Sequence, residues 1–270
     1  MMPRTEVSNG YLFDNEVYDN IIEKCELELT LSSDLECFVE TELLLSMNEI
    51  MLQHNIENRI NQAIFILFAQ AIKTFKSCLI LAINGYFTNT FINCRNIVEI
   101  LFSIKYITED PTSRLKRAED YLTKKNYWAD DNIRDRAYLA LDKPLYQIYQ
   151  ILCNYSHANY MGTAQNYDGK TMSISPSEEK IKPCIEVVNS IYYYLLKYIC
   201  MYYGICQDTF NTIQTPENFN EIIKFYESEK NIVDFVLNEV FVDTKLTEQQ
   251  KDDWLRDFKK FTIDKKKKKK

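Results

Sequence analysis

Glycine and proline are scarce in this sequence, which has only 5 Gly and 6 Pro among its 270 residues. Average usage is roughly 7% for glycine and 5% for proline, so the chain has little material for hairpins and tight turns. This scarcity argues against a many-stranded β architecture and favours long helices with few connections. With 46% hydrophobic residues, the chain can bury a core of ordinary size. We therefore expect an all-α fold.

Ligands for a structural zinc site are also lacking. The sequence has two histidines, His54 and His157, and its eight cysteines form no CxxC pair. The cysteines occur singly, mostly in apolar stretches, so we interpret them as reduced, buried thiols of a cytoplasmic protein. We expect neither a metal nor another cofactor.

The sequence lacks the common enzyme motifs. It also lacks the net positive charge of a protein that binds nucleic acid over a broad surface. There is no GxSxG, Walker A, HExxH or GxGxxG motif. The net charge is −7, and removing the six lysines of 265–270 from that sum leaves −13. An acidic body disfavours a broad footprint on duplex DNA but leaves room for a local basic cleft. We interpret the lysine run as a disordered, solubilising tail.

Targeting and membrane segments are not expected either. The first residues have neither a basic region nor an apolar region of the signal-peptide type. The most apolar stretch, 63–72, is interrupted by Lys73 and Lys76 before it reaches the ~20 residues that cross a bilayer. We predict a core helix there and no membrane partner.

Helical periodicity and helix-end signals divide the chain into four regions. We predict N-terminal helices over 1–57, a core helical bundle over 58–208, a C-terminal helical appendage over 209–264 and the polylysine tail over 265–270. A capping box at Ser33 to Glu36 predicts a helix that begins there and runs to about residue 55. Core helices are predicted over 58–84, 87–109 and 177–204, and another follows Pro144.

Three residues stand out as candidates for chemistry: Arg95, Glu99 and His157. Arg95 and Glu99 are four residues apart on one helix, so they share a face with apolar neighbours. His157 falls where a helix ends and a long loop begins, and its unperturbed pKa of about 6.5 suits proton transfer at neutral pH. Each residue also has a structural explanation: an intrahelical ion pair for Arg95 and Glu99, and a helix C-cap or core hydrogen bond for His157.

Two short motifs carry a resemblance to known proteins. The stretch Asn93-Cys-Arg-Asn-Ile-Val-Glu99 and the helix end Tyr149-Gln-Ile-Leu-Cys-Asn-Tyr-Ser-His157 resemble a widespread, uncharacterised bacterial helical family. Its members carry an R-x-x-x-E motif and a later Y-x-x-L-S-x-x-x-H-like helix end, and the resemblance covers roughly residues 55–205. Cys153 stands where that family has serine.

Families of this shape resemble the HEPN superfamily, whose helical domains occur in toxin–antitoxin and abortive-infection systems. The resemblance implies a HEPN-like bundle, a homodimer and a metal-independent endoribonuclease in antiviral defence. In those enzymes a His follows the Arg after four to six residues on the same helix. Here none follows Arg95, so His157 is the candidate partner.

The resemblance implies catalytic roles for Arg95, Glu99 and His157, and contacts to single-stranded RNA from Asn96, Asn154 and Tyr155. A second function remains open, that of a non-catalytic helical sensor or interaction subunit with a partner protein. In that case Arg95, Glu99 and His157 form a polar network that fixes helix packing.

Overall fold

The computed structural model describes residues 21–52, 58–123, 143–156 and 178–216, without the side chains of 143, 144, 154–156 and 178–180. The chain divides into two compact units, Met1–Lys224 and Phe225–Lys270, and all described residues belong to the first. Every regular element among them is a helix, which confirms the expected all-α class for this part of the chain. The helices predicted after residue 216 lie outside the described residues.

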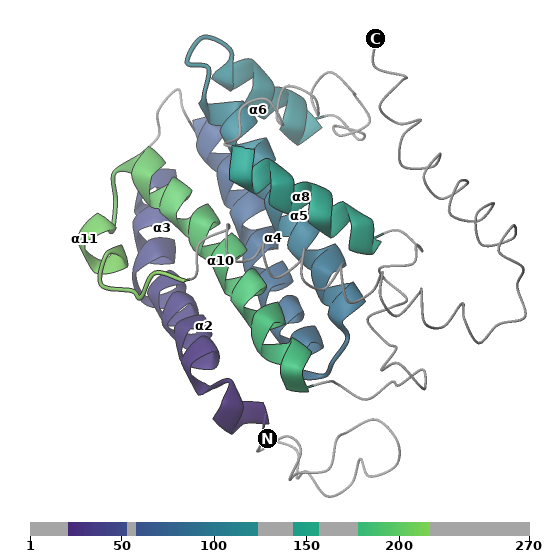
Figure 1. Cartoon of the computed structure of the whole chain (residues 1–270). Coiled ribbons are helices and arrows are strands. Elements are labelled where there is room, and N and C mark those ends of the chain that lie inside the picture. Colours follow the sequence, from purple (N-terminus) through teal and green to yellow (C-terminus); the bar gives the residue numbers. More distant parts are fainter. Residues whose placement is uncertain (1–20, 53–57, 124–142, 157–177, 217–270) are drawn as a thin grey trace, which may run out of the picture. The chain divides into compact units, whose positions relative to one another are not determined.

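Three long helices form the centre of the first unit: α4 (Asn58–Ile83), α5 (Phe87–Thr108) and α10 (Glu178–Tyr203) (Figure 1). Each contacts the other two, and their bounds confirm the core helices predicted from periodicity. Phe75 of α4 stacks on Tyr192 of α10 with ring centroids 3.9 Å apart, and both side chains are buried. Stacked aromatic rings bury large apolar areas, so this contact anchors the helix pair.

The turn between α4 and α5 is set by Gly85. Gly85 has a φ of 75°, a left-handed conformation that favours glycine. The backbone N–H of Tyr86 donates to the carbonyl of Leu81 at 2.8 Å, which closes the end of α4. The turn therefore returns the chain alongside α4 as α5.

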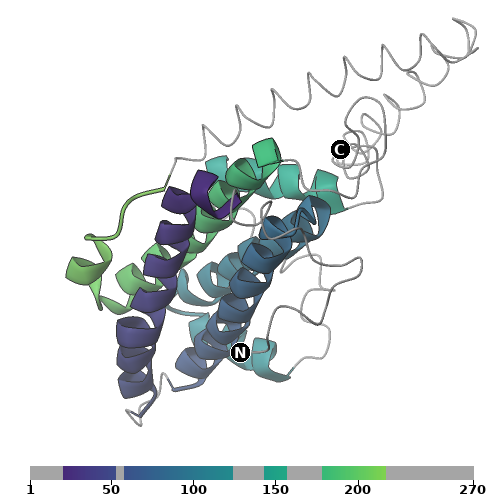
Figure 2. The same cartoon turned by 90° about the horizontal axis from the view of Figure 1, so that it is seen from below.

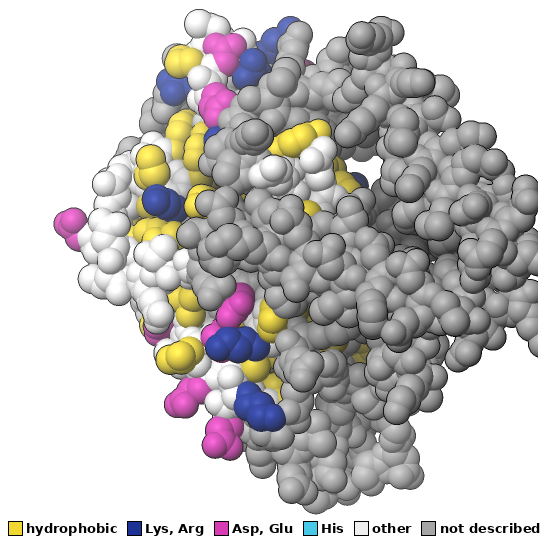
Figure 3. Space-filling view, viewed as in Figure 1, with side chains coloured by type: hydrophobic (Ala, Val, Ile, Leu, Met, Phe, Trp, Pro, Cys, Tyr) yellow, Lys and Arg dark blue, Asp and Glu magenta, His cyan; other side chains and the backbone are white. Residues whose placement is uncertain are grey.

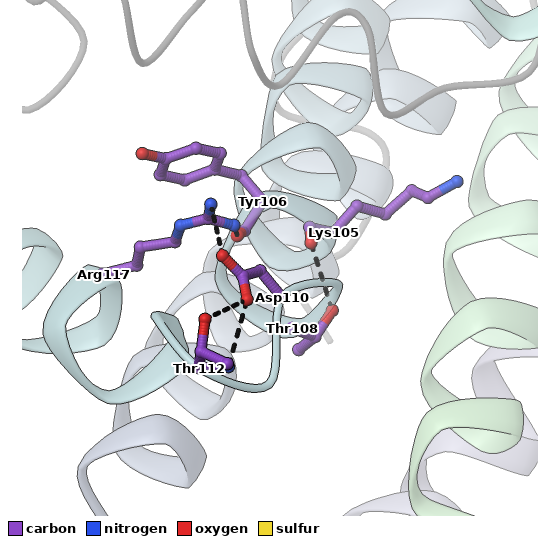
Figure 4. Close-up of polar contacts among 6 residues, drawn as sticks. All are labelled: Lys105, Tyr106, Thr108, Asp110, Thr112 and Arg117. Atoms are coloured by element: carbon purple, nitrogen blue, oxygen red, sulfur yellow. Dashed lines mark hydrogen bonds and ion pairs between the residues drawn. The ribbon is translucent and has the colours of Figure 1, made fainter.

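The turn from α5 to α6 (Arg114–Thr123) is held by Asp110 (Figure 4). Its carboxylate accepts hydrogen bonds from the backbone N–H and the hydroxyl of Thr112, at 3.0 and 2.6 Å. Arg117 donates to the other carboxylate oxygen at 3.2 Å and to the carbonyl of Tyr106 at 2.6 Å. Through Arg117, Asp110 thus ties α6 back onto the end of α5.

The N-terminal helices form one continuous column, consisting of α2 (Glu26–Phe38), a π-helical turn η1 (Val39–Leu43) and α3 (Leu44–Leu52) (Figure 2). The helix start predicted at Ser33 is wrong, because α2 runs through it without a break. Leu31, Leu35 and Phe38 are buried on both sides of Ser33. Burial of this stripe outweighs a local capping signal, since most helical stability in proteins comes from packing.

The remaining described helices cover the three central ones. α8 (Lys143–Ser156) packs against α5, and the short α11 (Gln207–Phe210) contacts α10. Phe210 of α11 lies between Phe38 of α2 and Tyr193 of α10, with ring centroids 5.3 and 4.7 Å away. α5 is thus contacted by α4, α6, α8 and α10, and the candidate site lies on its α8 side.

On length and composition alone, α4 is apolar enough to cross a membrane. In its most apolar stretch, 44% of the residues are buried inside the protein. Within the first unit α4 contacts α3, α5, α6 and α10. The core helices of soluble proteins have the same length and composition, so this feature is weak support for a membrane span.

Candidate functional site

The structure brings two of the three predicted catalytic residues together. Nε of Arg95 lies 2.9 Å from Oε1 of Glu99, one turn further along α5. Both side chains are partly exposed, at 30% and 28%. The pair is therefore an intrahelical ion pair at the edge of the bundle, open to solvent but not fully hydrated.

A third residue, Tyr149 of α8, completes this cluster. Its hydroxyl donates to the same Oε1 of Glu99 at 3.1 Å, and its ring centroid lies 5.8 Å from Cζ of Arg95. The ring also packs on Phe102, with centroids 5.2 Å apart. One carboxylate oxygen thus accepts hydrogen bonds from two helices, and the guanidinium is held against an aromatic ring. We call Arg95, Glu99 and Tyr149 the α5–α8 cluster.

The guanidinium of Arg95 is stabilised in its charged form. Partial burial alone lowers its pKa, but the Glu99 carboxylate, Tyr149 and Cys153 together raise it above the ordinary value. A buried cation keeps its charge when an acceptor lies within hydrogen-bond distance. The cluster therefore presents a fixed positive charge in a partly desolvated setting, where electrostatic interactions are stronger than in water.

The cluster contacts indicate that α5 and α8 run antiparallel. Glu99 is bonded to Tyr149, whereas Arg95, one turn earlier on α5, interacts with Cys153, one turn later on α8. Moving along α8 towards its end therefore means moving along α5 towards its start. The last turn of α8 belongs to the same side of the molecule as the first half of α5.

The structure describes the other predicted site residues to different extents. Asn96 is half-buried on α5, next to Arg95 and about 100° around the helix from it. Asn154 and Tyr155 belong to the last turn of α8, but their side chains are not among those described. His157 directly follows α8 in the sequence and lies outside the described residues.

Tyr149 was not predicted as a site residue, although it belongs to the helix-end motif. The signal was its spacing: Tyr149 and Cys153 are four residues apart on α8, as Arg95 and Glu99 are on α5. Two such pairs can face each other only if the helices pack side by side, and the sequence does not state that contact. Among the described residues, no group of three or more His, Cys, Asp or Glu side chains could hold a metal ion.

Comparison with known proteins gives one match. Residues 61–127 match a family of unknown function (DUF5677). The matched segment runs from α4 through α5 to just beyond α6 and includes Arg95 and Glu99, but it does not reach Tyr149 or His157. Searches of curated proteins and of solved structures found no match.

Proposed function

We propose that this protein is a cytoplasmic, metal-independent ribonuclease of the bacterial defence or toxin type, which acts on single-stranded RNA as a homodimer. The observation that carries the proposal is the pair of hydrogen bonds on Oε1 of Glu99, which fixes the charged Arg95 at a partly exposed position. Preorganised charge aimed at a reacting group is usually the largest single contribution to catalysis.

The proposed reaction needs an acid–base group and a charge stabiliser. The ribose 2′-oxygen attacks the adjacent phosphorus and loses its proton to His157, while the bond from phosphorus to the 5′-oxygen breaks. Arg95 stabilises the negative charge on the five-coordinate phosphorus, and Glu99 and Tyr149 orient Arg95. The leaving 5′-oxygen takes up a proton, so the products carry a 2′,3′-cyclic phosphate and a 5′-hydroxyl group.

His157 enters this proposal through the sequence. It follows Ser156, the last residue of α8, and consecutive Cα atoms are about 3.8 Å apart across a trans peptide. Cys153, which interacts with Arg95, precedes it by four residues. Asn96, Asn154 and Tyr155 are the proposed contacts to unpaired bases.

The test is cleavage of a labelled single-stranded RNA in EDTA, with the ends of the products identified. We expect cleavage that leaves 2′,3′-cyclic phosphates. Arg95→Ala should slow it by roughly 10²–10³-fold and His157→Ala by roughly 10²–10⁴-fold. Asn48→Ala, at an exposed position of α3, is the control that should cleave like the parent. Intact RNA in every reaction would end this proposal.

A second function is supported by the same hydrogen bonds. A carboxylate that accepts from both α5 and α8 can also fix helix packing in a non-catalytic sensor or interaction subunit with a partner protein. That function predicts that Arg95→Ala and Glu99→Ala lower the melting temperature and leave binding of the partner unchanged. Unchanged melting in both variants contradicts it.

A further inference from the structure

The N-terminal column, residues 21–52, carries charge of almost one sign. It holds eight aspartate and glutamate residues and a single basic residue, Lys24, so its net charge is −7, equal to that of the entire chain. Like charges one turn apart on a helix destabilise it, whereas pairs of opposite charge stabilise it. The stability of the column therefore gives no reason for so one-sided a charge.

Three of the eight acidic residues are paired inside the described structure. Glu28 lies 3.2 Å from Lys182, and Lys76 lies 2.8 Å from Glu40 and 3.8 Å from Glu36. No ion pair joins the other five to a described residue; these are Glu23, Glu26, Asp34, Glu42 and Glu49. Most of the negative charge of the column is thus available to a partner.

The outer side of the column is one exposed stripe. Leu35, Val39, Leu43 and Met47 keep the inner side buried across η1, so the opposite side remains outward along the whole column. From residue 23 to residue 52 an exposed position recurs every three or four residues, over ~40 Å. The acidic and leucine residues among these positions are Glu23, Leu27, Asp34, Leu45, Glu49 and Leu52. We call these six residues the acidic leucine stripe.

The leucines distinguish this stripe from an ordinary solvated face. Leu27, Leu45 and Leu52 are 69%, 60% and 76% exposed, and Leu52 and Leu27 are the two most exposed large hydrophobic side chains in the described part of the chain. In Figure 3, acidic side chains lie beside hydrophobic ones over α2, at the lower left of the described surface. Single exposed leucines are normal, but apolar residues at helical spacing on one face are the anchors by which one helix packs on another.

We propose that the acidic leucine stripe is the docking site for a basic amphipathic helix of another protein. Apolar residues of that helix pack between Leu27, Leu45 and Leu52, and its lysine or arginine side chains pair with Asp34 and Glu49. The charge selects this occupant. Carboxylates repel nucleic acids and anionic membranes, and a second copy of the chain would bring two acidic stripes together.

The test is binding of a fluorescein-labelled peptide to the full chain, measured by fluorescence anisotropy. The peptide has three heptads with Leu at positions a and d and Lys at positions e and g; the reference peptide has Glu in place of Lys. We expect the lysine peptide to bind at least tenfold more tightly than the reference. Leu45→Ser should raise Kd at least fivefold because an apolar contact is lost. Asp34→Lys should do the same because an attraction becomes a repulsion.

Two matched controls make the same changes on other helices. Ile80→Ser alters a 63% exposed side chain of α4, and Glu119→Lys alters an exposed acid of α6; we expect either to change Kd less than twofold. The proposal is overturned if the lysine peptide does not bind at micromolar concentration, if both peptides bind equally, or if the controls weaken binding as much as the stripe variants. It is also overturned if Leu45→Ser lowers the sedimentation mass of the protein, since the occupant is then a second copy.

The inference goes beyond the proposed ribonuclease and does not depend on it. Peptide binding that depends on Leu45 and Asp34, in a chain that leaves RNA intact, supports the stripe and contradicts the ribonuclease. RNA cleavage by a chain whose Kd for the peptide is indifferent to both substitutions supports the ribonuclease and contradicts the stripe. Thermal melting of each variant checks that it is folded.

Discussion

The hydroxyl of Tyr149 on α8 and the guanidinium of Arg95 on α5 donate to the same oxygen of Glu99, at 3.1 and 2.9 Å. The position of Arg95 therefore depends on the docking of α8, even though Arg95 and Glu99 are neighbours on one helix. A change in α8 that moves Tyr149 therefore alters the position of the Arg95 guanidinium on α5.

Tyr149→Phe tests this dependence, because it keeps the buried ring and removes only the hydroxyl. We expect the free energy of unfolding to fall by ~0.5–1.5 kcal/mol, the net contribution of one hydrogen bond. Urea unfolding followed by circular dichroism measures it. Tyr86→Phe, at an exposed ring, should change stability by less than ~0.5 kcal/mol. Equal losses in the two variants would mean that the Glu99 contact contributes nothing.

The Asp110 turn predicts a dependence of stability on pH. Hydrogen bonds from the side chains of Thr112 and Ser113 and from the backbone of Thr112, with the nearby charge of Arg117, lower the pKa of Asp110 to about 2. Because the folded pKa lies below the unfolded value of about 3.9, the stabilisation is complete above pH 4 and is lost as the pH falls towards 2.

Asp110→Ala should accordingly melt at a lower temperature than the unaltered protein at pH 5–7. The difference should narrow between pH 4 and pH 2, where the carboxylate of the unaltered protein takes up a proton. Thermal melting at pH 7, 4 and 2.5 measures it, with Asp34→Ala at an exposed position of α2 as the control. A difference that stays constant down to pH 2.5 contradicts the assigned role of the charge.

Asn189 joins α10 to α2 through a buried pair of hydrogen bonds. Its amide donates to the carbonyl of Glu28 at 2.7 Å and accepts from the hydroxyl of Ser32 at 2.7 Å, and its side chain is fully buried. Asn189→Ala removes both hydrogen bonds and should lower the free energy of unfolding by ~1–3 kcal/mol. We expect a lower urea midpoint with an unchanged slope. Asn48→Ala should leave the midpoint unchanged.

The eight cysteines are free thiols that differ widely in exposure. Cys37 is exposed, whereas Cys94 and Cys200 are buried. Burial raises the pKa of the Cys94 thiol, and it raises the pKa of Cys200 to about 12. Since the thiolate is the reactive form, iodoacetamide should label Cys37 in the native protein. Cys94 and Cys200 should be labelled only after unfolding. Mass spectrometry of labelled peptides measures this, and early labelling of Cys94 would contradict the packing of α4 on α5.

Much of the helical layout could be predicted from the sequence, because its signals are local. Gly85 closes α4 and Asp110 holds the turn before α6, and both act within a few residues, through a positive φ and through a capping carboxylate. The helix start predicted from the capping box at Ser33 was wrong, because the buried apolar stripe of α2 continues through Leu31 and Leu35 on both sides of Ser33. Which signal prevails depends on the surface that α2 meets, and that surface is more than a hundred residues away in the sequence.

In the candidate site, too, the contacts within one helix could be predicted from the sequence, and the contacts between helices could not. The pairing of Arg95 with Glu99 follows from spacing on one helix, so the sequence predicted it. The role of Tyr149 depends on the contact between α5 and α8, which spacing does not determine.

The π-helical turn η1 gives the N-terminal column a tolerance of length that its neighbours lack. The turn takes up one extra residue, and Leu35, Val39, Leu43 and Met47 remain buried across it. Deleting one residue of Val39–Leu43 would replace the wide turn with an unbroken α-helix. Leu35 and Met47 would then be eleven residues apart, which at 100° per residue leaves them within about 20° of the same face. A one-residue deletion in this turn should therefore keep α2 and α3 packed, whereas a deletion within α2 or α3 would turn the residues beyond it by about 100°.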